Sequence, residues 1–209
     1  MGVVERKERE KELRRESIVD AAERIFFNKG FEHATMNNVA EEAEFSKGAL
    51  YLYFHSKNEL YMAILQRSLL ILKNKMTKLL NNNTLSGIEK FAKIADIFIT
   101  FSYEHPNHYN SLLSYREHRE NCPASGSILQ STIEENKNMN KIFSDLIKQG
   151  QTDNAIKKNI DADMLSLAIW GNFTGIMPNS ILLDRSNLDF NPENIIKYHF
   201  KLLIDAIKV

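Results

Sequence analysis

One short stretch of the chain combines small and polar residues whose chemistry suits contact with nucleic acid. These residues are Ser46, Lys47, Gly48, Ala49, Tyr51 and Tyr53. Small side chains let a helix enter the major groove of DNA, and lysine and tyrosine can reach phosphates and base edges. The alternative interpretation is a surface helix of a helical bundle that contacts no nucleic acid.

A second group of side chains could bind a metal ion. It consists of His105, His108, His118 and Cys122. His118 and Cys122 are four residues apart, on one face of a helix, and imidazole and thiolate suit zinc, copper or nickel. However, His105 and His108 flank a proline turn, and Cys122 lies beside a predicted helix break. We therefore expect surface or capping roles for these residues, with no metal ion and no cofactor.

Catalysis has no support in the sequence. The chain has no nucleophile elbow, no phosphate-binding glycine loop and no zinc-type cysteine pair. Its formal net charge is zero, which argues against binding through bulk positive charge but allows a few well-placed cations. Charges alternate over residues 5–15, as is typical of a solvated helical extension. Alternatively, Lys7, Lys11 and Arg14 reach phosphates.

The composition predicts an all-α protein. Of 209 residues, 43% are apolar, and only 4 are proline and 8 glycine. No apolar run approaches the roughly 20 residues that a membrane helix needs. The N-terminus is charged and lacks the apolar core of a signal peptide, and the single cysteine, Cys122, excludes an internal disulfide. We therefore expect a cytoplasmic protein that does not bind membranes.

The elements around the nucleic-acid candidates form a helix-turn-helix over about residues 35–54. Apolar residues recur with helical spacing from Met36 to Ala43, and Thr35 precedes them as an N-cap. Ser46 is a second N-cap, so two short helices are joined by a tight turn. A helix from about Arg9 to Asn28, stopped by Gly30, precedes the motif.

A long helix follows the motif. Ser56 and Glu59 form a capping box at its start, and its apolar residues continue to Leu80. Its length exceeds what the preceding helices can bury. We expect it to connect the two halves of the chain.

These motifs resemble the TetR family of bacterial repressors over about residues 14–65. The matching segments are Arg15–Phe26, Lys29–Phe31, Ala34–Thr35, Val39–Ala43, Ser46–Phe54 and Ser56–Leu60. Glu44 departs from the family, which often has glycine in the turn, so it must adopt an unusual backbone angle or shift the turn.

The resemblance implies a DNA-binding domain over residues 1–60 and an effector-binding and dimerisation domain over 61–209. The predicted DNA contacts are Thr35, Ser46, Lys47, Gly48, Ala49, Tyr51, Tyr53, His55 and Lys57. Lys47 and Ala49 are expected nearest the base edges, and Tyr53 and Lys57 at phosphates.

The second half of the chain is predicted to form further helices. Ser86–His105 is apolar on nearly every face and is predicted to be enclosed. One helix is predicted over Asn107–Glu120, and another over Ser125–Lys148 stops at Gly150. Asp161 caps a strongly apolar helix that Pro178 should kink or end, and a last helix follows the loop Asp184–Asn191.

Aromatic residues concentrate in this half, either as a plain core or as the lining of an apolar ligand cavity. The predicted ligand contacts are Phe98, Phe101, Tyr109, Tyr115, Phe143, Trp170, Asn172 and Phe173. Tyr115, Trp170 and Asn172 are the favoured residues for orienting a ligand, because their polar groups need partners when buried.

The last two helices are too apolar for the surface of a monomer. Paired across a two-fold axis they would form a four-helix bundle, although burial within one monomer is the alternative. The sequence thus favours a homodimeric, ligand-responsive regulator that represses from a palindromic DNA operator until a small, largely apolar effector binds. A helical interaction or scaffold protein without DNA binding is the alternative.

Overall fold

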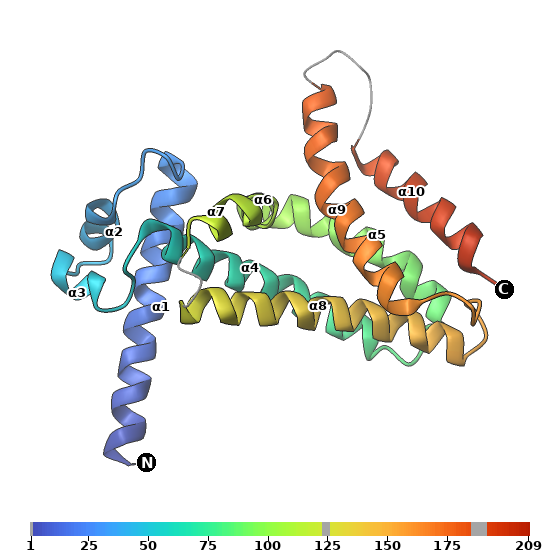
Figure 1. The fold of residues 1–209 in the computed structure, drawn as a ribbon, viewed down its shortest axis with the longest axis horizontal. Coiled ribbons are helices and arrows are strands. Elements are labelled where there is room, and N and C mark those ends of the chain that lie inside the picture. The colour runs from blue at the N-terminus through green and yellow to red at the C-terminus, as the bar shows by residue number, and fades with distance from the viewer. Residues whose placement is uncertain (1, 123–125, 185–191) are drawn as a thin grey trace. The chain divides into compact units, whose positions relative to one another are not determined.

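The structure is a computed structural model that describes residues 2–122, 126–184 and 192–209, with the backbone alone at Val3, 176–184 and Pro192. These residues form helices and one isolated antiparallel bridge between Ile156 and Lys208, so the all-α prediction is confirmed (Figure 1). The chain divides into two compact units. One comprises the residues up to Arg67 with Ser114–Thr132, and the other comprises Ser68–Leu113 with Ile133–Val209.

The first unit holds the helix-turn-helix. Its helices are α1 (Val3–Lys29), α2 (Met36–Glu42), α3 (Lys47–Tyr51), the start of α4 (Lys57–Leu80), α7 (Tyr115–Glu120) and the start of α8 (Ser127–Thr152). Fully buried apolar side chains such as Ile18, Val39 and Leu50 join α1, α2 and α3 in one core. α1 begins earlier than expected, and residues 5–14 are exposed. The predicted helical extension is therefore present and exposed, and phosphate contacts of Lys7, Lys11 and Arg14 stay a prediction.

The second unit contains the remainder of α4 and α8 and four further helices. These are α5 (Gly87–Glu104), α6 (Pro106–Leu113), α9 (Ala162–Asp184) and α10 (Pro192–Ile207). α10 packs on α5 and α9, and α6 packs on both α5 and α9 (Figure 1). The sequence suggested that α5 is enclosed on every face. It is not, because Ala92, Asp96 and Tyr103 are exposed.

Three predicted boundaries differ in the structure. The helix predicted over 107–120 is interrupted at Ser114, and its two parts, α6 and α7, belong to different units. α9 continues past Pro178 to Asp184, so that proline does not end the helix. Of the loop predicted at 184–191, residues 185–191 lie outside the described residues.

Gly150 does not stop α8, which continues to Thr152. It lies against Gly87 at the start of α5, where an added Cβ on Gly87 would be 2.0 Å from the Gly150 Cα. A side chain at either position would collide with backbone or with Ile156, since a Cβ on Gly150 would be 2.5 Å from the Ile156 Cδ1. The glycines therefore permit close packing within the second unit.

Candidate nucleic-acid interface and ligand site

Two side-chain caps define the helices of the helix-turn-helix. The Thr35 Oγ1 accepts a hydrogen bond from the Asn38 backbone N–H at 3.1 Å, and the Ser46 Oγ accepts one from the Ala49 N–H at 3.2 Å. Both predicted N-caps are confirmed. The Asn38 side chain also accepts from the Thr35 N–H at 3.2 Å, which closes a reciprocal capping box at α2.

The turn between α2 and α3 places Glu44 at a φ of 59°, in the left-handed region. The Phe45 N–H donates to the Ala40 carbonyl at 2.8 Å, and the Glu44 N–H donates to the Glu41 carbonyl at 3.1 Å. This pair of bonds is the Schellman arrangement that ends many helices. Of the two possibilities for a non-glycine residue here, the chain adopts the unusual backbone angle, at a cost of roughly 1–2 kcal/mol.

α3 presents its predicted contact residues to solvent while two large side chains hold it in place. Leu50 is completely buried and Phe54 is 1% exposed, so they anchor the helix. The exposed residues are Ser46, Lys47, Gly48, Tyr51 and His55, with Ala49 and Tyr53 partly exposed and Thr35 exposed at the start of α2. A Cβ at Gly48 would meet nothing within 4 Å, so packing within the chain does not require glycine there.

Leu52 was missed by the sequence reasoning. It follows α3 directly and is 80% exposed, an unusual position for a large apolar side chain. Its place beside Tyr51 puts an apolar surface next to the exposed polar residues. The helical spacing was the signal that could have found it, because residues two positions apart on a helix face nearly opposite sides and Leu50 is buried.

Lys57 is engaged within the first unit. Its Nζ donates to the Phe31 carbonyl at 2.6 Å and lies 4.2 Å from the centroid of the Phe31 ring. The lysine thus fixes the segment between α1 and α2 to the start of α4. Its contact with a DNA phosphate stays a prediction.

The start of α4 is capped as predicted, with one difference. The Ser56 Oγ accepts from the Glu59 N–H at 3.1 Å. The Glu59 carboxylate, however, accepts from the His55 N–H at 2.7 Å, not from the N-cap residue itself. This bond orders the connection between α3 and α4, where His55 remains exposed.

His118 is buried, so the expectation of a surface or capping role for it is wrong. It comes from α7, is 4% exposed, and its ring centroid lies 3.7 Å from that of Tyr61 and 4.2 Å from that of Phe31. Its Nδ1 lies within hydrogen-bond distance of the Asn58 Oδ1, at 3.0 Å. Burial lowers the pKa of His118.

The four residues weighed as metal ligands are not brought together. His105 and His108 belong to the second unit, whereas His118 and Cys122 belong to the first. Within the described part of the chain, no three histidine, cysteine or acidic side chains are placed to hold a metal ion. Burial raises the pKa of the Cys122 thiol.

Five of the eight predicted ligand residues form one aromatic cluster in the second unit. Phe98 stacks on Phe173 at 3.6 Å between centroids, and Tyr109 meets the same ring edge-on at 5.4 Å. Phe143 lies 5.8 Å from Phe98, and Trp170 lies 6.1 Å from Phe173. We call Phe98, Tyr109, Phe143, Trp170 and Phe173 the aromatic cluster.

The other three predicted ligand residues lie outside this cluster. Phe101 is buried and its ring is 5.5 Å from that of His105. Asn172 is partly exposed on α9. Tyr115 belongs to the first unit, where Arg119 lies 5.8 Å from its ring.

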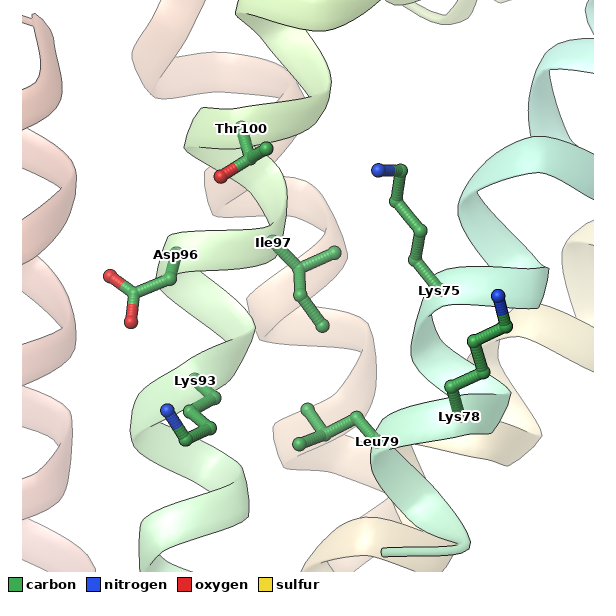
Figure 2. A pocket seen from close by; sticks show the side chains of 7 residues that line it. All are labelled: Lys75, Lys78, Leu79, Lys93, Asp96, Ile97 and Thr100. Carbon is green, nitrogen blue, oxygen red and sulfur yellow. The ribbon is translucent and has the colours of Figure 1, made fainter.

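A surface hollow of about 400 Å³ lies in the second unit, away from the aromatic cluster. α4 and α5 line it with Lys75, Lys78, Leu79, Lys93, Asp96, Ile97 and Thr100 (Figure 2). Leu79 and Ile97 extend into the space between the two helices, whereas Asp96 points away from α4. Lys75 is paired with Glu104 at 2.7 Å. None of the predicted ligand residues lines this hollow.

α9 and α10 expose large apolar side chains. Met164 and Leu167 on α9 are 68% and 55% exposed, and Tyr198 and Leu202 on α10 are 63% and 52% exposed. Each pair is separated by three or four residues, so it lies on one face of its helix. No helix among the described residues has the length and apolar character needed to span a membrane.

The sequence of this chain matches known transcriptional regulators. Residues 18–64 match the family described as bacterial regulatory proteins, tetR family. An uncharacterised HTH-type regulator from the lacX 3' region of Lactococcus lactis is 26% identical over 198 residues, covering 90% of both chains. The uncharacterised HTH-type regulator YfiR of Bacillus subtilis is 44% identical over 59 residues, only 28% of this chain and 29% of that protein.

The fold also matches solved structures over most of its length. One is the regulator FadR of Bacillus subtilis in complex with stearoyl-CoA, with a TM-score of 0.66, 17% identity, and coverage of 90% of this chain and 96% of that one. The capped helix-turn-helix, the matched segment and this fold agree with one another. They favour a DNA-binding regulator over an enzyme or a scaffold protein. The chain is a DNA-binding transcriptional regulator of the TetR family.

Proposed function

We propose that this regulator is a homodimeric repressor that leaves a palindromic DNA operator when a small, largely apolar ligand binds to its second unit. The observation that carries the proposal is the form of α3. It is a short helix anchored by Leu50 and Phe54, with lysine, glycine and tyrosine facing solvent. Such a helix can enter the major groove, where a bulkier one would be excluded.

The DNA contacts follow from position on this helix. Lys47 and Ala49 lie nearest the base edges, and Tyr53 and Lys57 contact phosphates. The remaining contacts are Thr35, Ser46, Gly48, Tyr51 and His55. Leu52 joins them, because an exposed apolar side chain at the end of α3 suits a thymine methyl group.

The dimer forms through α9 and α10. The exposed side chains of Met164, Leu167, Tyr198 and Leu202 supply an apolar face that water would otherwise cover. Gly171 is also exposed on α9, and a Cβ there would meet nothing within 4 Å. A helix from a second copy can therefore approach closely. Two helices from each copy make a four-helix bundle, which sets the spacing of the two recognition helices.

The ligand binds at the aromatic cluster. The cluster gathers five aromatic side chains with few polar groups, the composition that usually lines small-molecule sites, although its rings pack on one another without a ligand. The stearoyl-CoA bound by the similarly folded FadR supports an apolar ligand for this architecture. Release from DNA requires the ligand to bind the non-binding conformation more tightly than the DNA-binding one, and that difference in affinity limits the response.

A genomic selection tests the DNA-binding part. The purified chain is mixed with fragments of bacterial genomic DNA at moderate salt, and bound fragments are sequenced. We expect an inverted repeat whose half-sites are about one helical turn apart or a multiple of it. Recovery of fragments without a shared repeat would argue against a dimeric operator. Expression from a promoter carrying the selected site then tests repression.

A further inference from the structure

The hydroxyl group of Tyr109 is buried and has no hydrogen-bond partner among the described residues. Tyr109 lies in α6, is 3% exposed, and its oxygen makes no hydrogen bond to any described residue. Most buried polar side-chain atoms in proteins are hydrogen-bonded, because leaving one unpaired costs free energy. No described residue supplies the missing acceptor, and a molecule bound beside Tyr109 would supply it.

The ring that carries this hydroxyl packs among other aromatic rings. The Tyr109 ring meets Phe173 edge-on, and Phe173 in turn contacts Phe98 and Trp170. A bound water needs two to four polar neighbours, and rings supply few. A largely apolar molecule can contact the rings and satisfy the hydroxyl at the same time.

A second buried polar atom lies on α8, the helix that carries Phe143. The Oδ1 of Asn140 is buried and has no partner among the described residues. Asn140 lies three residues before Phe143 on α8, so the two share one face of that helix. An amide oxygen only accepts hydrogen bonds, so a ligand that carries an acceptor would satisfy the Tyr109 hydroxyl and not this atom.

The chemistry of the phenol selects the kind of partner. Burial raises the pKa of Tyr109, so at neutral pH the group is protonated and can donate a hydrogen bond. An anionic acceptor would bring an unpaired charge among aromatic rings, which is costly. In the described part of the chain, the cation–ring contacts involve Phe54, Phe31 and Tyr115, none of which belongs to the cluster.

We propose that the effector is a neutral, largely apolar molecule with a carbonyl or ether oxygen, and that the Tyr109 hydroxyl donates a hydrogen bond to that oxygen. The inference rests on the proposed ligand-responsive function and adds the chemical class of the ligand. It assigns the orienting role to Tyr109, whereas the sequence favoured Tyr115, Trp170 and Asn172.

Matched probes test this assignment. Acetophenone and ethylbenzene have nearly the same shape, and 2-undecanone and undecane form a longer pair. Within each pair only the ketone has an acceptor. Trp170 is the single tryptophan of the chain and belongs to the cluster, so its fluorescence reports binding there. Melting temperature supplies a second readout.

The decisive variant is Tyr109→Phe, which removes only the hydroxyl. We expect it to weaken ketone binding about tenfold, the effect of losing one hydrogen bond, and to change hydrocarbon binding by less than about twofold. Tyr103→Phe is the matched control, because Tyr103 is 67% exposed on α5. It should change neither ketone binding nor hydrocarbon binding. Without a probe, Tyr109→Phe should melt no lower than the unmodified protein, since the hydroxyl makes no hydrogen bond to the described residues.

Three results would overturn the inference in distinguishable ways. Equal effects of Tyr109→Phe on ketone and hydrocarbon would show that the hydroxyl does not recognise an acceptor. A lower melting temperature of the ligand-free variant would show that the hydroxyl has a partner within the protein. If no probe binds the unmodified protein, the ligand site at the cluster is rejected together with the inference, while operator binding remains a separate measurement.

Discussion

Arg67 joins α4 to α1 through three carboxylates, and its removal is the most informative stability test in the first unit. Its guanidinium lies 2.7 Å from Asp20 and 3.1 Å from Glu23, and it is also hydrogen-bonded to Glu16. The variant Arg67→Met keeps the apolar length of the side chain and removes the charge. Three acidic groups would then face one another with no counter-ion.

The expected cost follows from burial. Exposed ion pairs contribute about 0–1 kcal/mol, and breaking a buried pair costs about 3–5 kcal/mol. Arg67 is 22% exposed and Glu23 is 16% exposed, whereas Asp20 is 53% exposed and therefore contributes little. We expect Arg67→Met to lower the free energy of unfolding by about 2–3 kcal/mol, between the two limits.

The pH dependence has a definite sign. Burial raises the pKa of Glu23, and Arg67 opposes this rise. Without Arg67 the pKa rises further, so the folded state takes up a proton more readily than the unfolded state. The deficit of Arg67→Met should therefore be largest at neutral pH and shrink as pH falls through the raised pKa of Glu23, where the carboxyl becomes neutral.

Urea unfolding followed by far-UV circular dichroism at pH 7.5 and at about pH 5 measures both effects. Arg24→Met is the control, because Arg24 pairs with Glu42 across the same unit but the two side chains are 55% and 37% exposed. Arg24→Met should lower the free energy of unfolding by less than about 1 kcal/mol. An Arg67→Met variant that loses no more stability than Arg24→Met, or that loses the same amount at both pH values, would contradict this expectation.

Three further predictions concern DNA, pH and assembly. Lys57→Ala should weaken binding to all DNA sequences about equally and reduce the salt slope by about one, as fluorescence anisotropy at several salt concentrations would show. An unchanged slope would leave Lys57 with only its bond to Phe31. Because burial lowers the pKa of His118, the folded state resists its protonation, and stability should fall as pH drops below about 6.5. His118→Phe keeps a ring between Phe31 and Tyr61, so its melting temperature should fall less between pH 7.5 and 5.5; an equal fall would assign the effect to other groups. Leu202→Glu should yield monomers in sedimentation, whereas the exposed neighbour Lys201→Glu should not, and a dimeric Leu202→Glu would exclude that residue from the interface.

Local signals in the sequence determined the helix-turn-helix. The N-caps at Thr35 and Ser46 and the apolar spacing of α2 depend on residues three or four positions apart, so their structure follows from nearby sequence. The start of α4 at Ser56 and the cap of α9 at Asp161, whose carboxylate accepts from the Met164 N–H at 3.0 Å, were predictable for the same reason. The aromatic candidates of the second unit could also be chosen by type.

Contacts between residues far apart in the chain decided the rest. His118 is 57 positions after Tyr61 in the numbering, yet the two rings touch, so no local pattern could reveal that the histidine is buried. Glycine often ends a helix, and the sequence predicted that role for Gly150. In the structure Gly150 instead allows two helices to pack closely, because Gly87 lies against it. The unpaired hydroxyl of Tyr109 likewise depends on what surrounds it. Tyrosines look alike in sequence, and only burial by other helices leaves this one without a partner among the described residues.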